Sequence, residues 1–229
     1  MKFKNPFKAL SVGELTLWLC SFLAVALSFV LSPERDVISL VASLIGVTAL
    51  IFIAKGMVIG QVLTVVFAIL YGIASYTFAY YGEMITYLCM SAPAAIVAII
   101  SWVRNPYSDS GTVHVAKRLS RGSVLLTLTL TVSLTVAFYF ILGALGTANL
   151  VTSTVSVTTS LLASLLVILR SPYYAIAYAA NDVVLIVLWT MASIEDIGYL
   201  PMIICFVAFL ANDLYAFGNW RKMRREQNG

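Results

Sequence analysis

The stretch PYYAIAYAANDVVLIVLWTMAS, residues 172–193, is long and apolar enough to cross a bilayer, yet it carries the dipeptide Asn181-Asp182 near its middle. The same dipeptide recurs as Asn212-Asp213 in the next apolar run. A carboxylate at membrane depth costs about 2.5–3.5 kcal/mol even on the mildest insertion scale, so it persists only where it faces protein or a wet cavity. The two dipeptides therefore predict a functional site inside a membrane protein.

Composition identifies the class of protein. Of the 229 residues, 61% are apolar and 10% are charged, whereas ordinary soluble domains carry about 25% charged residues. Eight apolar runs approach the ~20 residues that a spanning helix needs; they cover 13–31, 36–54, 57–79, 83–103, 122–145, 148–169, 172–193 and 199–219. We predict an all-α integral membrane protein, a single transporter-like domain over 1–229 with eight transmembrane helices.

The distribution of basic residues predicts the orientation in the membrane. If the N-terminus is cytoplasmic, all Lys and Arg residues except Arg35 lie on the cytoplasmic side, and the outer turns at 34–36, 81–83, 146–149 and 195–196 are acidic or neutral. Cleavage of the first run as a signal peptide is the less favoured alternative, because the apolar run continues to Leu31. We expect a multi-pass protein of the bacterial cytoplasmic (inner) membrane with both termini in the cytoplasm.

Three landmarks recur in the same order in runs two to four and six to eight. A basic residue follows the first run of each set, an acidic turn follows the second, and the third ends in Trp with Arg close behind, as in Trp102 and Trp220. Positive-inside pressure alone could produce the basic landmarks, so coincidence stays an alternative. A true repeat predicts a flanking helix at 13–31, a first bundle at 36–103, a linker helix at 122–145 and a second bundle at 148–219, with a substrate site between the bundles.

The run 172–193 presents several polar and aromatic residues on one stripe. Tyr174, Tyr178, Asn181, Leu185 and Trp189 follow i, i+4, i+7, i+11, i+15 spacing, which places them on one helical face. Aromatic faces can stack on a flat ring, and Asn and Asp can bind hydroxyls or a carboxamide. The stripe predicts a small, planar, hydroxylated ligand; a cationic ring would also favour aromatic faces and a nearby carboxylate.

Candidates from other runs complete the predicted substrate site. Besides Tyr174, Tyr178, Asn181, Asp182 and Trp189, the set contains Asn212, Asp213, Gln61 and Tyr87. For each of them the alternative is structural, because Asn and Asp also join helices by hydrogen bonds and aromatic residues also fill cores. The sequence predicts no catalytic residue, no metal site and no cofactor.

Four segments in this order resemble the Pnu family of bacterial vitamin and nucleoside facilitators, whose PnuC branch moves nicotinamide riboside. They are YYGEM (80–84), WVRNPY (102–107), YAANDVVLIVLW (178–189) and NDLYAFGNW (212–220), within about 36–222. The resemblance implies a fold like that of the SWEET transporters, with a three-plus-one-plus-three core of parallel repeats. It also implies passive uptake of a vitamin-like solute, which cytoplasmic kinases trap by phosphorylation for NAD salvage, and a substrate contact by Asn181.

One departure from the family pattern bears on the substrate. The spacing of the nicotinamide riboside branch is Trp-x-x-Trp-x-x-x-Asn, whereas this chain has Tyr174 and Ala177 at the two Trp positions before Asn181. The resemblance therefore implies facilitated diffusion of nicotinamide riboside, with (deoxy)ribonucleosides or another B vitamin as the alternative.

Functions of other kinds stay open as less favoured alternatives. Asp182 or Asp213 could carry a proton in a coupled carrier, the two carboxyls could activate water in an intramembrane aspartyl hydrolase, or the chain could be a receptor without transport. The protein is expected not to be an enzyme. The expected partners are a nucleoside-like small molecule and the lipid bilayer, without nucleic acid; a homo-oligomer is left open.

Overall fold

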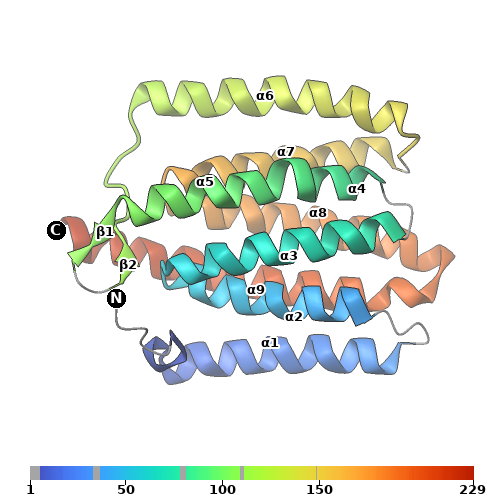
Figure 1. Ribbon diagram of the computed structural model, residues 1–229, viewed down its shortest axis with the longest axis horizontal. Helices are drawn as coiled ribbons and strands as arrows, with labels where there is room; N and C mark the ends of the chain where they lie inside the picture. Colours follow the sequence, from blue (N-terminus) through green and yellow to red (C-terminus); the bar gives the residue numbers. More distant parts are fainter. Residues whose placement is uncertain (1–5, 33–36, 78–80, 109–110, 148) are drawn as a thin grey trace.

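The computed structural model describes residues 6–32, 37–77, 81–108, 111–147 and 149–229, and this part of the chain is almost entirely helical (Figure 1). It contains 8 helical segments long and apolar enough to cross a membrane, which confirms the predicted fold class. Six of the spans are single helices: α1 (Val12–Leu31), α2 (Val37–Ala54), α3 (Val58–Thr77), α6 (Arg121–Ala144), α7 (Leu150–Ile168) and α8 (Tyr174–Glu195).

The last span is longer than its apolar pattern. After the short η4 (Ile197–Tyr199), α9 (Leu200–Asn228) continues past the predicted end at 219 to Asn228. The extra turns are polar, and they stay helical because they bind the loop that precedes α6. Gln227 accepts a hydrogen bond from Val115 N–H at 2.7 Å, and Asn228 donates to the Val115 carbonyl at 3.3 Å. Apolar periodicity ends at the membrane surface, whereas these side-chain bonds carry the helix beyond it.

The fourth span is interrupted by a π-helical segment. It consists of α4 (Tyr81–Ile85), η2 (Thr86–Ser91) and α5 (Ala92–Val103). Pro93 lies at the start of α5, and it has no N–H to donate to the carbonyl four residues back. The N–H of Ala92 instead bonds to the Tyr87 carbonyl, five residues back. The extra residue in this turn displaces Tyr87 and Ser91 from regular α-helical positions, and single π turns of this kind recur at functional sites.

Six spans form a closed ring, which we call the helix ring. Neighbouring helices pack in the order α2, α3, α4–α5, α7, α8 and α9, and α9 packs back on α2. Helix α1 lies outside this ring against α2 and α9, and α6 lies outside it against α7 (Figure 1). A ring of six spans packed in chain order is compatible with the predicted repeat, which stays a prediction.

The turns after α2 and α7 have the same backbone geometry. Gly56 and Arg170 both have positive φ, at 69° and 56°. In the first turn Gly56 N–H bonds to Ile53 O and Met57 N–H to Phe52 O; in the second, Arg170 N–H bonds to Val167 O and Ser171 N–H to Leu166 O. This pair of bonds is the Schellman motif that ends many helices. Glycine adopts positive φ without strain, so Gly56 serves this turn.

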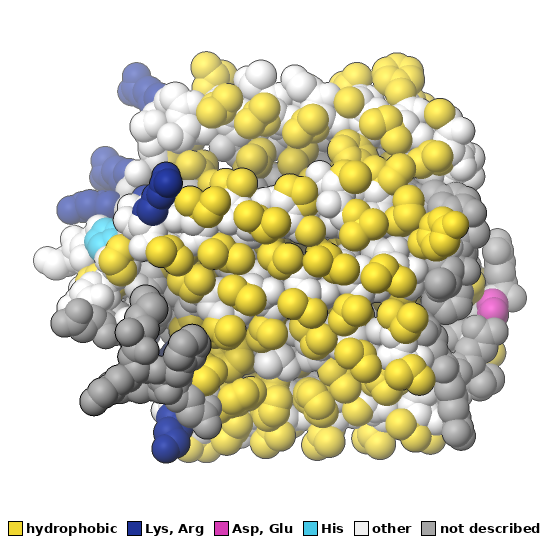
Figure 2. All heavy atoms as spheres, viewed as in Figure 1, with side chains coloured by type: hydrophobic (Ala, Val, Ile, Leu, Met, Phe, Trp, Pro, Cys, Tyr) yellow, Lys and Arg dark blue, Asp and Glu magenta, His cyan; other side chains and the backbone are white. Residues whose placement is uncertain are grey.

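The surface fits a bilayer. Hydrophobic side chains cover the middle of the face in Figure 2, and Lys and Arg gather at one end of the bundle, the end that carries both termini in Figure 1. We call this the basic end. It also carries a small hairpin, β1 (Pro106–Tyr107) paired with β2 (Thr112–Val113). Of the residues used to predict orientation, Lys2, Lys4, the turn 34–36 with Arg35, and Ala148 of the turn 146–149 lie outside the described residues; so does Tyr80 of the segment YYGEM.

The two halves of the ring are joined at the basic end by equivalent hydrogen bonds. Trp102 at the end of α5 donates its indole N–H to the Val167 carbonyl of α7 at 3.1 Å, and Trp220 of α9 donates to the Ile53 carbonyl of α2 at 2.8 Å. One residue earlier in each half, the Ser101 hydroxyl donates to Ile168 O and the Asn219 amide donates to Ala54 O, both at 2.7 Å. The predicted Trp landmarks thus bond each half to the other.

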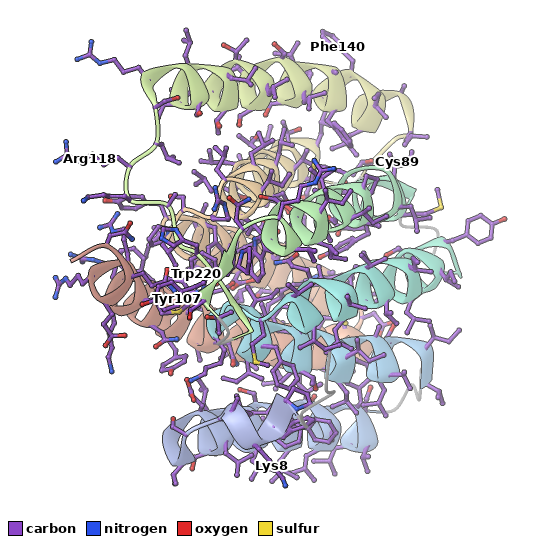
Figure 3. All side chains as sticks on the ribbon, turned by 60° about the vertical axis from the view of Figure 1, so that its left-hand side comes forward. Lys8, Cys89, Tyr107, Arg118, Phe140 and Trp220 are labelled. Atoms are coloured by element: carbon purple, nitrogen blue, oxygen red, sulfur yellow. The ribbon has the colours of Figure 1, made fainter. Side chains whose placement is uncertain are left out.

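The two indoles also contact each other. Their rings lie 5.4 Å apart, and both side chains are almost fully buried in a cluster with Tyr174 and Val113. Figure 3 shows Trp220 near the hairpin that carries Tyr107, whereas Phe140 points outward from α6. This buried cluster packs between the helices of the ring at the basic end.

Candidate functional site

A small, partly open cavity lies inside the helix ring, between its middle and the basic end. Its volume is about 80 Å³. Every span of the ring contributes to its lining: Gly46, Ala49, Leu50 and Ile53 from α2; Gln61, Thr64, Phe67 and Ala68 from α3; Tyr87 and Ser91 from η2; Ser160 from α7; Tyr178, Asn181 and Asp182 from α8; and Phe206, Phe209 and Asp213 from α9. The polar residues of the lining are therefore drawn from both halves.

Asn181 is held in place by hydroxyl groups of α7. Its side-chain oxygen accepts hydrogen bonds from Ser156 at 3.1 Å and from Thr159 at 2.9 Å. The side chain is 6% exposed and lines the cavity. Because the oxygen is already bonded, the amide NH₂ is the group left to donate to a molecule in the cavity. Two fixed bonds orient this amide before any ligand arrives, which lowers the entropy cost of binding.

Asp182 and Asp213 meet across the interface of α8 and α9. Both are 3% exposed and both line the cavity. Asp182 Oδ2 is buried and has no hydrogen-bond partner in the described structure. The pair therefore presents an unsatisfied acceptor at the cavity wall. A pair of this kind is costly inside a membrane protein unless a ligand or a proton compensates it.

Two further polar groups face the pair from other positions. Gln61 of α3 is 3% exposed and lines the cavity, and no hydrogen bond is recorded for its amide among the described residues. Tyr178 of α8 bonds through its hydroxyl to Ser164 of α7 at 3.0 Å. The amide of Gln61 can both donate and accept, so it could bind a hydroxyl or a carboxamide of a bound solute.

An aromatic wall covers the side of the cavity formed by α3, η2 and α9. The ring of Phe67 contacts those of Tyr87 at 5.6 Å and Phe209 at 5.8 Å, and Phe209 contacts Phe206 at 5.6 Å. Aromatic pairs at these distances are mutually attractive and present both ring faces and ring edges. The wall thus adds aromatic surface to a lining that also carries polar side chains.

Three of the predicted site residues lie outside this lining. Tyr174 packs on Trp220 with ring centres 4.8 Å apart at the basic end, and Trp189 packs on Tyr199 at 5.6 Å toward the other end. Asn212 donates to Ser21 of α1 at 2.9 Å and to Ala208 O at 2.8 Å, so it joins two helices. Tyr174 and Trp189 are roughly 22 Å apart along α8 at 1.5 Å per residue. A cavity of this size cannot reach both ends of that stripe, and it contacts neither residue. Gln61, Tyr87, Tyr178, Asn181, Asp182 and Asp213 do line the cavity.

The helices of this ring match a known family. The family model described as nicotinamide mononucleotide transporter matches residues 36–222. The chain belongs to the nicotinamide mononucleotide transporter family. As a member, it is a multi-pass membrane transporter with the 8 candidate spans described above.

Named relatives of the family cover nearly the whole chain. A nicotinamide riboside transporter PnuC of Neisseria mucosa is 30% identical over 217 residues, which are 93% of this chain and 82% of that protein. A second PnuC, of Haemophilus influenzae, is 24% identical over 214 residues, 92% of this chain and 91% of that protein. The crystal structure of the vitamin B3 transporter PnuC aligns with a TM-score of 0.81 at 26% identity, covering 96% of this chain and 94% of that one.

Sequence reasoning did not select several cavity residues of this family member. Phe67, Phe206 and Phe209 are ordinary apolar residues in apolar runs, so nothing in the sequence distinguishes them from lipid-facing positions. Thr159 and Ser156 of α7 do lie in a run rich in hydroxyl residues, a composition that by itself more often indicates close helix packing. The structure shows that Ser156 and Thr159 hold Asn181. Their partner lies on another helix, and spacing within one run cannot reveal it.

Proposed function

We propose that this protein is a facilitator that carries nicotinamide riboside across the bacterial cytoplasmic membrane. The observation that carries the proposal is the cavity between the two halves of the ring. It is lined by Asn181, which α7 orients, by two aspartates and by an aromatic wall. Family membership and relatives named as nicotinamide riboside transporters support it. No residue of this site needs to perform covalent chemistry.

The lining matches the parts of this solute one by one. Its nicotinamide ring is flat and positively charged, which suits the aromatic wall formed by Phe67 and Phe209 and the carboxyls of Asp182 and Asp213. Its ribose hydroxyls and carboxamide need donors and acceptors, which Gln61 and Asn181 supply. Tyr87 and Tyr178 add ring faces and hydroxyls to the same space.

Transport requires the cavity to widen. The present volume of about 80 Å³ holds about two or three water molecules at ~30 Å³ each, whereas pockets for small organic ligands measure roughly 300–1,000 Å³. In the conformation described here the cavity is therefore too small for such a ligand. Because Trp102, Trp220 and their carbonyl partners join the halves at the basic end, opening toward that side would have to separate these bonds.

The proposed direction is inward, and the driving force is the solute's own gradient. By the positive-inside rule the basic end faces the cytoplasm, together with both termini. Phosphorylation of nicotinamide riboside by a cytoplasmic kinase would keep its free concentration low and so sustain uptake. We place the protein in the inner membrane on the same reasoning.

Uptake into proteoliposomes tests the proposal. Purified protein reconstituted into vesicles should take up labelled nicotinamide riboside until the inside and outside concentrations are equal, and a kinase with ATP enclosed in the vesicles should raise the total uptake above that level. Protein-free vesicles are the control. Uptake no faster than in those vesicles contradicts the proposal, whereas accumulation without a kinase that collapses with the proton gradient indicates a proton-coupled carrier.

Another nucleoside or B vitamin is the second candidate, favoured by one local feature. The positions that the nicotinamide riboside branch fills with Trp hold Tyr174 and Ala177 here, and neither lines the cavity. A thermal-shift screen against nucleosides and B vitamins decides between the two, because a ligand that binds only the folded state raises its apparent stability. A larger shift with a deoxyribonucleoside than with nicotinamide riboside would reassign the substrate.

An aspartyl hydrolase is the remaining candidate with structural support, since Asp182 and Asp213 line the same cavity from adjacent helices. The named relatives are transporters, and we propose that the protein is not an enzyme. Product formation lost with both Asp182→Asn and Asp213→Asn would reverse this conclusion.

A further inference from the structure

A groove with a volume of about 790 Å³ lies at the basic end, beside the helix ring rather than inside it. Three segments form its walls: the loop and first turn of α6, the residues just before α8, and the polar tail of α9. Helix α6 packs on α7 outside the ring (Figure 1), so the groove separates the start of α6 from the ends of α8 and α9. Its volume falls within the roughly 300–1,000 Å³ of pockets for small organic ligands.

Every charged side chain in the lining of this groove is basic. The four are Lys117 and Arg118 from the loop before α6 and Arg224 and Arg225 from the tail of α9. No ion pair is recorded for any of them among the described residues, whereas Lys222 on the same tail pairs with Glu226. Like charges gathered without a carboxylate side chain repel one another, so an anion bound between them is stabilising.

The rest of the lining is largely apolar and continues into the lipid-facing surface. Leu119 and Val124 lie at the entry to α6, and Pro172 and Tyr173 precede α8. Val124 and Leu128, one turn apart on the same face of α6, are 41% and 52% exposed. The groove therefore has a cationic part and an apolar part that runs along α6 toward the bilayer.

Arg224 is held over the floor of the groove. Its guanidinium lies 5.8 Å from the centre of the Tyr173 ring, within the range of a cation–π contact, and the Tyr173 side chain is 53% exposed. Tyrosines near the ends of spans lie at the level of the lipid headgroups. A guanidinium at that level can bind a phosphate through two parallel N–H bonds. Figure 3 shows Arg118 beside the loop that leads to α6.

We propose that this groove, which we call the basic groove, binds the phosphate of an anionic phospholipid from the leaflet that the basic end faces, with an acyl chain along Val124 and Leu128. Basic pockets between transmembrane helices on the cytoplasmic side suit such headgroups. The apolar part of the groove favours a lipid over a soluble phosphate compound. None of the groove residues lines the cavity inside the ring, so this inference does not depend on which solute is carried.

Thermal unfolding of the full-length protein in detergent tests the proposal. Phosphatidylglycerol is added to one sample and phosphatidylcholine with the same acyl chains to another, because a ligand that binds only the folded state raises its apparent stability. Phosphatidylglycerol should raise the melting temperature by several degrees more than phosphatidylcholine. Glycerophosphoglycerol, which carries the same headgroup phosphate without acyl chains, should give no shift at the same concentration.

Variants matched in charge locate the site. Arg118→Gln and Arg224→Gln should each weaken phosphatidylglycerol binding about fivefold, and the double variant should lose most of the lipid-specific shift. The control is Arg221→Gln with Lys222→Gln, which removes the same charge from positions of α9 outside the groove. Arg221 also lies over an aromatic ring, that of Phe217 at 5.4 Å, so the control matches the loss of a cation–π contact. It should keep the shift.

Each variant is compared with the two lipids separately, so a lower stability of the variant itself cancels, and Arg118→Gln alone tests the site if Arg224→Gln fails to fold. Equal losses in the groove and control variants, or equal shifts with the two lipids in the wild-type protein, overturn the proposal. A shift with glycerophosphoglycerol as large as that with phosphatidylglycerol also overturns it and assigns the groove to a soluble phosphate compound. All three results leave the proposed transport function intact.

Discussion

The two halves of the helix ring are alike at the basic end and different at the cavity. At the basic end Trp102 and Trp220 donate to corresponding carbonyls of the opposite half, and the turns at Gly56 and Arg170 share one backbone geometry. At the cavity the corresponding helices diverge, because α3 contributes Thr64, Phe67 and Ala68 where α8 contributes Tyr178, Asn181 and Asp182. The contacts that join the halves are therefore alike in the two halves, whereas the lining of the cavity is not.

The largest effect is expected from breaking the symmetric contact itself. Trp102→Ala and Trp220→Ala each remove a fully buried indole, and such truncations cost about 3–5 kcal/mol in soluble cores. Trp220 also packs on Tyr174 at 4.8 Å, so its loss should lower the melting temperature in detergent more than the loss of Trp102.

Milder variants of the same pair separate hydrogen bonding from packing. Trp102→Phe and Trp220→Phe keep an aromatic ring and lose only the bond to a carbonyl, worth about 0.5–1.5 kcal/mol each. The two rings lie 5.4 Å apart, so the double variant should deviate from additivity. Additive losses in the double variant would mean that the two sites are independent, and the symmetric contact would not act as a unit.

The second-largest effect is expected on ligand binding at the cavity, where the two halves differ. Asn181→Ala removes the amide that Ser156 and Thr159 orient, and it should reduce nicotinamide riboside binding about 10- to 100-fold, the equivalent of one to two hydrogen bonds. Gln61→Ala on α3 should have a smaller effect, because no protein group holds its amide in a binding geometry before the ligand arrives. Calorimetry measures both affinities.

Asn181→Ala needs a folding control because its side chain also joins α7 to α8. Thr159→Val removes one of the two bonds to Asn181 but leaves the amide in place. If the melting temperature falls as far in Thr159→Val as in Asn181→Ala while binding is retained only in the former, the amide acts on the ligand. Loss of folding with preserved affinity in the folded fraction would assign Asn181 to packing.

Much of the fold follows from composition and charge, because a membrane imposes simple rules. Runs of ~20 apolar residues must be helices, so the eight spans could be predicted, and the landmarks Trp102 and Trp220 could be paired. The polar tail of α9 could not be predicted, because it depends on hydrogen bonds to the loop before α6. The π-helical turn before Pro93 could not be predicted either, because the apolar pattern does not show which carbonyl the Ala92 N–H reaches.

The candidate site could be predicted only in part, for a related reason. A polar residue in an apolar run must find a partner, and the sequence shows the residue without the partner. Asp182 and Asp213 line the same cavity, whereas Asn212 bonds to Ser21 of α1. Both dipeptides look the same in the sequence, and only the position of the neighbouring helix separates a cavity residue from a helix contact.

The third prediction compares alanine substitutions at two glycines in neighbouring helices of the ring, Gly60 of α3 and Gly46 of α2. A methyl group on Gly60 of α3 would lie 2.6 Å from the Ile53 backbone nitrogen, and backbone cannot yield without moving α2, so Gly60→Ala should destabilise the protein by about 1–3 kcal/mol. A methyl group on Gly46 would lie 2.6 Å from the tip of the Phe209 ring, which can rotate.

Gly46→Ala should therefore act on binding more than on stability, because the displaced Phe209 ring and the methyl group both occupy the cavity. Thermal unfolding and calorimetry on the two variants should give opposite rankings. Equal loss of stability in both would show that Phe209 is as fixed as backbone, and the aromatic wall could not then move aside to admit a ligand.

The smallest effect is expected outside the ring, where α1 is joined to it at the basic end. Glu14 of α1 accepts from Tyr215 of α9 at 2.6 Å and pairs with Lys55 at 3.2 Å. The Lys55 side chain is 26% exposed, so Lys55→Met should cost only about 0.5 kcal/mol, because Tyr215 and the Ser11 N–H still bind the carboxylate. Uptake by vesicles should stay at the wild-type rate, since Lys55 does not line the cavity. A large loss of uptake with an unchanged melting temperature would show that α1 takes part in opening the ring, and the functional unit would then extend beyond the two halves.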